Sequence, residues 1–88
     1  MDESRDGQIE KLARGIIGLL LDKNESFEIV IVPGDNETLI RARTMSAMSA
    51  SKLTGDKGRT AQSIRTIVAA AGTKLGHRYK FEVEGFRS

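Results

Sequence analysis

The chain has 88 residues, of which 39% are hydrophobic and 30% charged, and its net charge is +2 at pH 7. This length is typical of one domain with a modest core, which leaves little room for an enclosed substrate cavity. The composition excludes a disordered chain, and the absence of cysteine excludes disulfides and thiolate chemistry. The apolar runs are too short to span a membrane, and the acidic start, Met1-Asp2-Glu3, does not resemble a signal peptide, so we expect a cytoplasmic protein.

The charges are distributed unevenly along the chain. Residues 1–40 contain nine acidic and four basic residues, which gives −5, whereas residues 41–80 contain nine basic residues and one acid, which gives +8. A strongly basic half is typical of a nucleic-acid binder. A solvated basic surface without a ligand would show the same pattern.

The chain begins with a polar stretch at residues 1–7, which we expect to be a flexible tail with Ser4 or Asp6 as a helix N-cap. Apolar residues then recur at spacings of three and four from Ile9 to Leu20, which predicts an amphipathic helix that ends before Asp22.

Two strands are predicted next. Residues 27–32 are rich in β-branched and aromatic side chains, and residues 37–43 alternate between apolar and polar residues. Between them Pro33 and Gly34 suit the two central positions of a type II turn, so we expect an antiparallel hairpin.

Residues 44–53 contain mostly small residues and methionine, and we predict a short helix capped by Ser46. Met45 and Met48 fit its apolar face, together with Leu53, so we expect the two methionines to fill gaps in the core.

Helical spacing returns from Ala61 to Leu75, with Gly76 as a C-cap, and residues 78–84 alternate as a third strand. The order helix, strand, strand, helix, helix, strand predicts an α+β domain at residues 8–84, with a three-stranded sheet and helices packed on one face. Residues 85–88 are expected to form a C-terminal tail.

The turn Leu53-Thr54-Gly55-Asp56-Lys57-Gly58-Arg59-Thr60 is the most informative stretch of the sequence. Two glycines three residues apart permit a sharp bend and a close approach to a ligand, because neither has a Cβ atom. The helix that follows adds free N–H groups and partial positive charge at the same place. Phosphate groups bind such turns, although a plain helix-to-helix turn is the structural alternative.

Residues 53–71, Leu-Thr-Gly-Asp-Lys-Gly-Arg-Thr-Ala-Gln-Ser-Ile-Arg-Thr-Ile-Val-Ala-Ala-Ala, resemble the signature of KH domains. More narrowly, the Arg-Thr-Ala, Ile-Arg-Thr and alanine-rich segments resemble the small single-domain bacterial KH proteins of the KhpA type. The order of elements resembles a type II KH domain over residues 8–84. This resemblance implies a cytoplasmic module for single-stranded RNA or DNA that clamps four nucleotides between a G-x-x-G loop and a strand edge.

The resemblance also implies a set of binding residues. The loop itself would face the phosphates, and residues beside it would lie on the first turns of the next helix. Apart from the resemblance, the charges of three arginines could extend the basic surface. These RNA-binding candidates are Thr54, Gly55, Asp56, Lys57, Gly58, Arg59, Thr60, Ser63, Ile64, Arg65, Arg41 and Arg43.

Two residues depart from the usual KH pattern. Thr54 replaces a branched apolar residue and makes the groove more polar, and Asp56 partly offsets the charge of Lys57. The few aromatic residues sit on or after predicted strands, where packing is more common than base stacking. We therefore expect weak binding with little sequence preference.

Other functions have less support in the sequence. His77 is the sole histidine and lacks cysteine partners, and no catalytic carboxylate pair stands out, so we expect no metal, no cofactor and no enzyme activity. We expect an RNA chaperone or post-transcriptional regulator. A ribosome-assembly factor that binds rRNA is an alternative, although ribosome-binding factors of similar fold typically lack an intact G-x-x-G turn. The other alternative is a protein-interaction module that forms a homodimer, or a heterodimer with a larger KH-containing protein of the Jag type.

Overall fold

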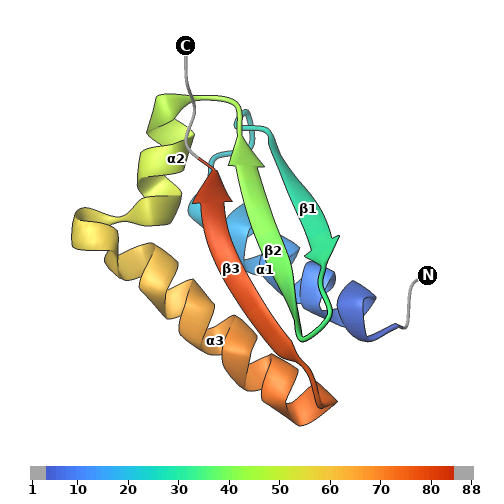
Figure 1. The fold of residues 1–88 in the computed structure, drawn as a ribbon. Coiled ribbons are helices and arrows are strands. Elements are labelled where there is room, and N and C mark those ends of the chain that lie inside the picture. The colour runs from blue at the N-terminus through green and yellow to red at the C-terminus, as the bar shows by residue number, and fades with distance from the viewer. Residues whose placement is uncertain (1–3, 85–88) are drawn as a thin grey trace.

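The computed structural model describes residues 4–84, and Figure 1 shows its fold. Its elements are α1 (Arg5–Leu20), β1 (Phe27–Pro33), β2 (Glu37–Thr44), α2 (Ala47–Thr54), the short 3-10 turn η1 (Asp56–Gly58), α3 (Arg59–Leu75) and β3 (Arg78–Glu84). This order confirms the predicted α+β class with the α-β-β-α-α-β arrangement. The tail expected at residues 85–88 lies outside the described residues, as do residues 1–3.

The first helix begins at Arg5, directly after Ser4, one of the two residues predicted as its N-cap. Ser4 is its N-cap, and its hydroxyl oxygen accepts a hydrogen bond of 3.0 Å from the N–H of Gly7. The tail predicted at residues 1–7 is therefore wrong for residues 5–7, which form the first turn of α1. The tyrosine hydroxyl of Tyr79 donates to the carboxylate of Asp6 and fixes this turn to β3. Burial raises the pKa of Tyr79 to about 12, and the hydrogen bond to Asp6 adds to the rise.

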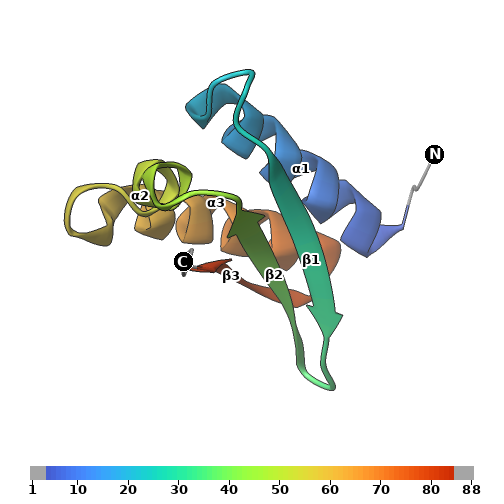
Figure 2. The same ribbon diagram turned by 90° about the horizontal axis from the view of Figure 1, so that it is seen from above.

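The three strands form one sheet in the order β1-β2-β3. β1 and β2 pair antiparallel, with Ile31 opposite Ile40, which confirms the predicted hairpin. β3 pairs parallel to β2, with Phe81 opposite Ile40, because the chain returns to the sheet only after α2 and α3. In the view of Figure 2 the helices lie on one side of this sheet.

The hairpin turn differs from the prediction. A type II turn needs a positive φ at Gly34, but the positive-φ glycines of the described residues are Gly55, Gly58 and Gly76. Glycine is required at position 34 for a different reason. A Cβ there would lie 2.7 Å from the carbonyl oxygen of Glu37, so the turn depends on a close backbone approach.

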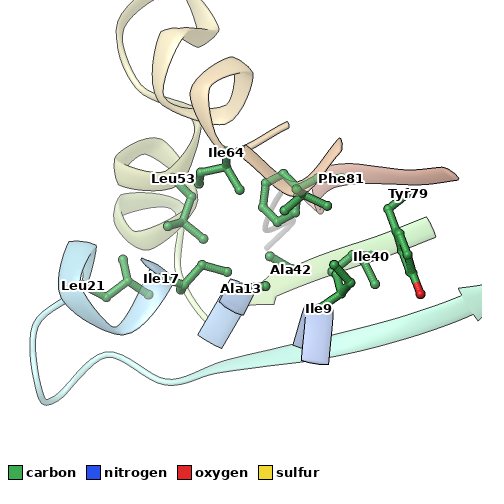
Figure 3. Packing of buried hydrophobic residues seen from close by; sticks show 11 residues of the cluster. Ile9, Ala13, Ile17, Leu21, Ile40, Ala42, Leu53, Ile64, Tyr79 and Phe81 are labelled. Carbon is green, nitrogen blue, oxygen red and sulfur yellow. The ribbon is translucent and has the colours of Figure 1, made fainter. Parts of the chain in front are cut away.

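One hydrophobic core joins the helices to the inner face of the sheet. Figure 3 shows side chains from all three helices, β2 and β3 converging in this cluster. Its buried members are Ile9, Ala13, Ile17, Leu21, Ile40, Ala42, Leu53, Ile64, Val68, Tyr79 and Phe81. Each fully buried isoleucine or leucine contributes roughly 1.5–3 kcal/mol by leaving water.

The predicted role of the methionines is wrong. Met45 and Met48 are 50% and 69% exposed, whereas Leu53 is fully buried. α2 has only eight residues and turns Ser49 and Leu53 toward the core, so its remaining face points to water. None of the helices in residues 4–84 is long and apolar enough to cross a membrane.

α3 packs closely on β3 because Gly72 has no side chain. A Cβ at Gly72 would lie 2.7 Å from both the His77 carbonyl oxygen and Cδ2 of Tyr79. Gly76 has a φ of 76° and ends the helix as the predicted C-cap. The chain then turns directly into β3, so the end of α3 lies beside the start of β3, and the two elements diverge toward the start of α3.

Candidate nucleic-acid interface

The G-x-x-G turn, residues 55–58, joins α2 to α3 at the edge of the molecule, where the ribbon is yellow in Figure 1. Its backbone is left-handed at two consecutive residues, Lys57 (φ 56°, ψ 27°) and Gly58 (φ 75°, ψ 12°). The N–H of Gly58 donates to the carbonyl oxygen of Gly55 at 3.2 Å. The turn is thus a tight, internally bonded loop.

Gly55 is required by its surroundings. Its φ is 77°, and a Cβ there would lie 2.6 Å from Cβ of Thr60 and 2.8 Å from the Thr60 nitrogen. Thr60 therefore packs directly on the bare Cα of Gly55. This contact fixes the turn against the first residues of α3.

The turn presents positive charge to solvent. Gly58 is the N-cap of α3 and has no side chain that could cap the helix. The N–H of Arg59, the first residue of α3, donates to the carbonyl oxygen of Asp56. Lys57 and Arg59 are exposed, and neither forms an ion pair within residues 4–84. Asp56 is exposed beside them, which leaves one net positive charge on the three side chains.

An open groove of about 600 Å³ lies between α3 and β3, and we call it the α3–β3 groove. Its lining residues are Leu39, Gln62, Arg65, Thr66, Ala69, Tyr79, Lys80, Phe81 and Glu82. The helix side of the groove contains small and polar residues. Because Gln62 lies four residues after Gly58 on α3, the groove begins beside the turn.

Arg65 lies in this groove and contacts both of its walls. Its Nε donates to the carbonyl oxygen of Phe81 in β3 at 3.0 Å, and its Nη1 donates to Oε1 of Gln62 at 3.4 Å. Of the three arginines predicted to extend the basic surface, Arg65 is the one that lines this groove.

The other two arginines do not join the turn. Arg41 and Arg43 alternate with the buried Ile40 and Ala42, so they lie on the outer face of the sheet, opposite the helices. Arg41 bonds to Glu82 at 2.7 Å, and Arg43 bonds to Glu84 at 2.9 Å. Their charges are thus offset by carboxylates of β3, and their role in RNA binding stays a prediction.

Two further candidates play structural roles. Ile64 is 2% exposed and belongs to the core, so its prediction as a contact residue is wrong. The hydroxyl of Ser63 donates to the carbonyl oxygen of Arg59 at 3.0 Å but remains on the exposed face of the first turns of α3. Thr54 is the exposed last residue of α2, next to Gly55.

A polar cluster behind the turn holds α2 in place. The ammonium group of Lys52 lies 2.6 Å from Oε1 of Glu25, and the Ser49 hydroxyl donates to Oε2 of Glu25 at 2.5 Å. These two bonds, with Lys52 as the larger cause, lower the pKa of Glu25 to about 2. The same bond to Glu25, together with one to Asp22, raises the pKa of Lys52. The cluster ties the α1–β1 loop to the helix that leads into the turn.

His77 has a structural partner. Its Nε2 and the Thr38 hydroxyl form a hydrogen bond of 2.8 Å, and its ring meets Tyr79 edge-on with centroids 5.1 Å apart. Within the part of the chain that the structure describes, no three His, Cys, Asp or Glu side chains gather as a metal site.

The groove residues Gln62, Thr66 and Ala69 were absent from the sequence-based candidates. Their spacing was the available signal, because positions 58, 62, 65, 66 and 69 fall on one side of a helix. The strand that faces them could not be identified until the parallel pairing of β3 was known.

Sequence comparisons place this chain among small bacterial proteins. The family model described as the KH domain of KhpA/KhpB matches residues 10–83. RNA-binding protein KhpA of Bacillus subtilis is 30% identical over 78 residues, covering 89% of this chain and 95% of the relative. RNA-binding protein KhpA of Borreliella burgdorferi is 29% identical over 73 residues, covering 83% of this chain and 88% of the relative.

A comparison with solved structures supports the fold. A crystal structure of Era from Aquifex aeolicus, bound to GDP and aluminium fluoride, matches 94% of this chain with a TM-score of 0.60. The match covers 31% of Era, and the sequence identity is 18%, so the likeness concerns the fold alone.

Proposed function

The chain belongs to the KhpA/KhpB family of KH domains, and on this premise we propose that it binds single-stranded RNA by clamping the backbone with the G-x-x-G turn. Its curated relatives carry the name of RNA-binding proteins, which supports RNA as the partner. KH domains hold four nucleotides, with the backbone at this loop. The proposed role is that of a cytoplasmic RNA chaperone or post-transcriptional regulator without enzyme activity.

One observation carries the proposal. The turn combines exposed Lys57 and Arg59, which form no ion pair within residues 4–84, with the uncapped start of α3. Phosphate oxygens would accept hydrogen bonds from the N–H groups and offset both cations. The α3–β3 groove opens beside this point and offers space for bases.

Charge removal at Lys57 tests the clamp. Lys57→Asn suits the left-handed backbone and removes the cation, so RNA affinity should fall about tenfold or more, as expected for a lost charged hydrogen bond. Lys57→Asp places two adjacent carboxylates at the turn and should abolish binding. Affinity is measured by fluorescence anisotropy with a short single-stranded RNA, and circular dichroism checks the fold.

The matched control is Lys23→Asp. Lys23 is an exposed lysine in the loop after α1 and forms no ion pair within residues 4–84. The same change of charge there should alter affinity by less than about twofold, because Lys23 belongs neither to the turn nor to the groove lining and an exposed charge is screened by salt. Equal losses in the Lys57 and Lys23 variants would show a general charge effect and contradict the clamp.

A second candidate function is pairing with another KH protein, either a second copy or a larger protein of the Jag type. The exposed methionines favour it, because Met45 and Met48 present apolar side chains at the start of α2. Light scattering tests the homodimer, and copurification from cells tests a heterodimer. A pairing surface there predicts that Met48→Glu weakens the dimer, whereas unchanged association would assign pairing to another surface.

The ribosome-assembly alternative differs in its RNA partner. The intact left-handed turn at Lys57 and Gly58 argues for backbone clamping of single strands. Crosslinking in cells followed by sequencing of bound RNA separates the two roles, because an assembly factor would recover chiefly rRNA.

A further inference from the structure

Arg65 is held in one orientation by bonds that leave part of its guanidinium group free. Nε donates to the Phe81 carbonyl oxygen and Nη1 to Gln62, while Nη2 has no acceptor within residues 4–84. Arginine normally loses side-chain entropy when it binds a ligand. Because Arg65 is already bonded to β3, much of its side-chain entropy is lost on folding rather than on RNA binding. The same bond fixes the orientation of its remaining N–H groups.

The position of Arg65 along α3 suits a base next to the clamped phosphate. Gly58, Gln62, Arg65 and Ala69 follow each other at spacings of four, three and four and therefore share one side of the helix. Gly58 and Arg65 are seven residues apart, which is about 10 Å along the helix axis. A strand whose phosphate lies at the turn can therefore bring a following base into the groove beside Arg65.

The groove offers few other groups that could recognise a base. Tyr79 and Phe81 line it but are 5% and 3% exposed, so their ring faces belong to the core. Glu82 lines it as well, but its carboxylate is bonded to Arg41. Lys80 is paired with Glu37 at 3.1 Å. Within the described lining, the planar groups with free donors are the guanidinium group of Arg65 and the amide of Gln62, whose Oε1 accepts from Arg65. Only Arg65 has free N–H donors on two neighbouring nitrogen atoms.

We propose that Arg65 gives the α3–β3 groove a preference for guanine or cytosine at one base position. The proposal rests on the function proposed above. Two neighbouring N–H donors fit a base edge with two neighbouring acceptors, which guanine provides at O6 and N7. Unpaired cytosine provides the same pattern at O2 and N3, an edge that proteins read in single strands. On the corresponding edges adenine and uracil each place a donor beside an acceptor. Only one of the two N–H donors of Arg65 would then find an acceptor.

The direct test compares RNAs that differ in one base. Octamers of uridine carry one central guanosine, cytidine, adenosine, uridine or 7-deazaguanosine, and affinities are measured by fluorescence anisotropy. Guanosine or cytidine should bind at least about fivefold more tightly than adenosine, since a bidentate contact discriminates by at least that factor. If the guanosine octamer binds more tightly than the adenosine octamer, the 7-deazaguanosine octamer should bind no more tightly than the adenosine octamer, because 7-deazaguanosine lacks the N7 acceptor.

Arg65→Lys is the matched variant, because it keeps the charge and loses the planar pair of donors. It should remove the base preference, so that the guanosine, cytidine and adenosine octamers bind the variant with the same affinity. Arg14→Lys, the same change at the exposed Arg14–Glu10 pair on α1, should retain the preference. A purely structural role for Arg65 would weaken all five octamers equally.

The outcomes separate this inference from the proposed function. If the wild-type chain binds none of the octamers, the RNA-binding function itself fails, and the inference fails with it. If it binds all octamers alike, or if Arg65→Lys keeps the preference, RNA binding stands and the role of Arg65 is overturned. The 7-deazaguanosine comparison uses the wild-type chain, so it gives a result for guanine whatever the stability of the variant.

Discussion

Lys57 combines an unfavourable backbone with a charge at the tip of the turn. It is the one non-glycine residue with positive φ within residues 4–84. A left-handed backbone costs a residue with a side chain roughly 1–2 kcal/mol. Glycine would avoid this cost but would bring no cation to the turn. The choice of lysine at this position is thus consistent with a binding role.

The two glycines of the turn should differ in their tolerance of alanine. Gly58→Ala introduces a left-handed alanine into open space, because no atom lies within 4 Å of its Cβ position, so it should cost about 1 kcal/mol. Gly55→Ala adds a clash with Thr60 and should cost about 2–4 kcal/mol. Urea unfolding measures both values. Equal losses would show that Thr60 does not restrain the turn.

At the scale of elements, α2 is a short helix that is anchored at both ends. Leu53 packs in the core near its end, and Ser46 caps its start. Between them Lys52 and Ser49 bond to Glu25, on the loop between α1 and β1. An isolated helix of eight residues is unstable in water, so these contacts determine where the G-x-x-G turn begins.

The Glu25 cluster predicts acid sensitivity. The pKa of Glu25 is lowered from 4.5 to about 2 in the folded chain, so its contribution to stability is present above pH 4.5 and is lost as the pH falls toward 2. The pKa of Lys52 is raised, so its contribution is complete below pH 10.5 and is lost as the pH rises through the folded value.

Urea unfolding between pH 7 and pH 2.5 tests the predicted loss of stability at acid pH. The wild type should lose stability below about pH 4.5, and Glu25→Gln should show a smaller loss over the same range. Lys52→Met removes the main cause of the lowered pKa and should also flatten the curve. Parallel curves for all three proteins would refute the assignment to this pair.

Alanine substitution should have opposite effects on stability at two helical glycines, Gly72 and Gly15, because only Gly72 lies at the contact between α3 and β3. Alanine is normally better than glycine in a helix by about 1 kcal/mol. Gly15→Ala on α1 has no atom within 4 Å of its new Cβ and should stabilise the protein by about 0.5–1 kcal/mol. Gly72→Ala would push α3 away from His77 and Tyr79 and should destabilise it by about 1–2 kcal/mol. Thermal or urea unfolding gives both signs, and stabilisation by both changes would contradict the close packing.

At the scale of the whole molecule, the basic residues divide into two groups. On the outer face of the sheet, Arg41, Arg43 and Lys80 pair with glutamates of neighbouring strands. At the turn, Lys57 and Arg59 form no such pair within the described residues. The net charge of a segment therefore does not distinguish the paired cations of the sheet from Lys57 and Arg59, which form no ion pair within residues 4–84.

Much of the fold followed from periodicity and turn chemistry. The spacing of apolar residues predicted α1, the hairpin, α3 and β3, because each of these elements buries one regular face. The methionines of α2 were misplaced because a short helix has too few turns to reveal which side is buried. The need for glycine at position 72 was not predictable, because it arises from the close approach of the neighbouring strand.

The candidate site was predictable where one local segment forms it. Gly55, Lys57 and Gly58 are neighbours in sequence, so the pattern alone identified the loop. The ion pairs of Arg41 and Arg43 and the burial of Ile64 could not be predicted, because they depend on partners far along the chain. Arg65 was identified as a basic residue, but its bond to Phe81 joins residues 16 apart and required the packing of α3 on β3.

The central claim is that RNA lies across the G-x-x-G turn and the α3–β3 groove. An NMR titration of the 15N-labelled chain with a short single-stranded RNA tests it most directly, because each backbone amide reports its own surroundings. We predict that the largest shift changes occur at residues 55–60 and at Gln62, Arg65 and Thr66, with small changes at Arg41 and Arg43. Changes concentrated on the outer face of the sheet, or none at saturating RNA, would contradict the account.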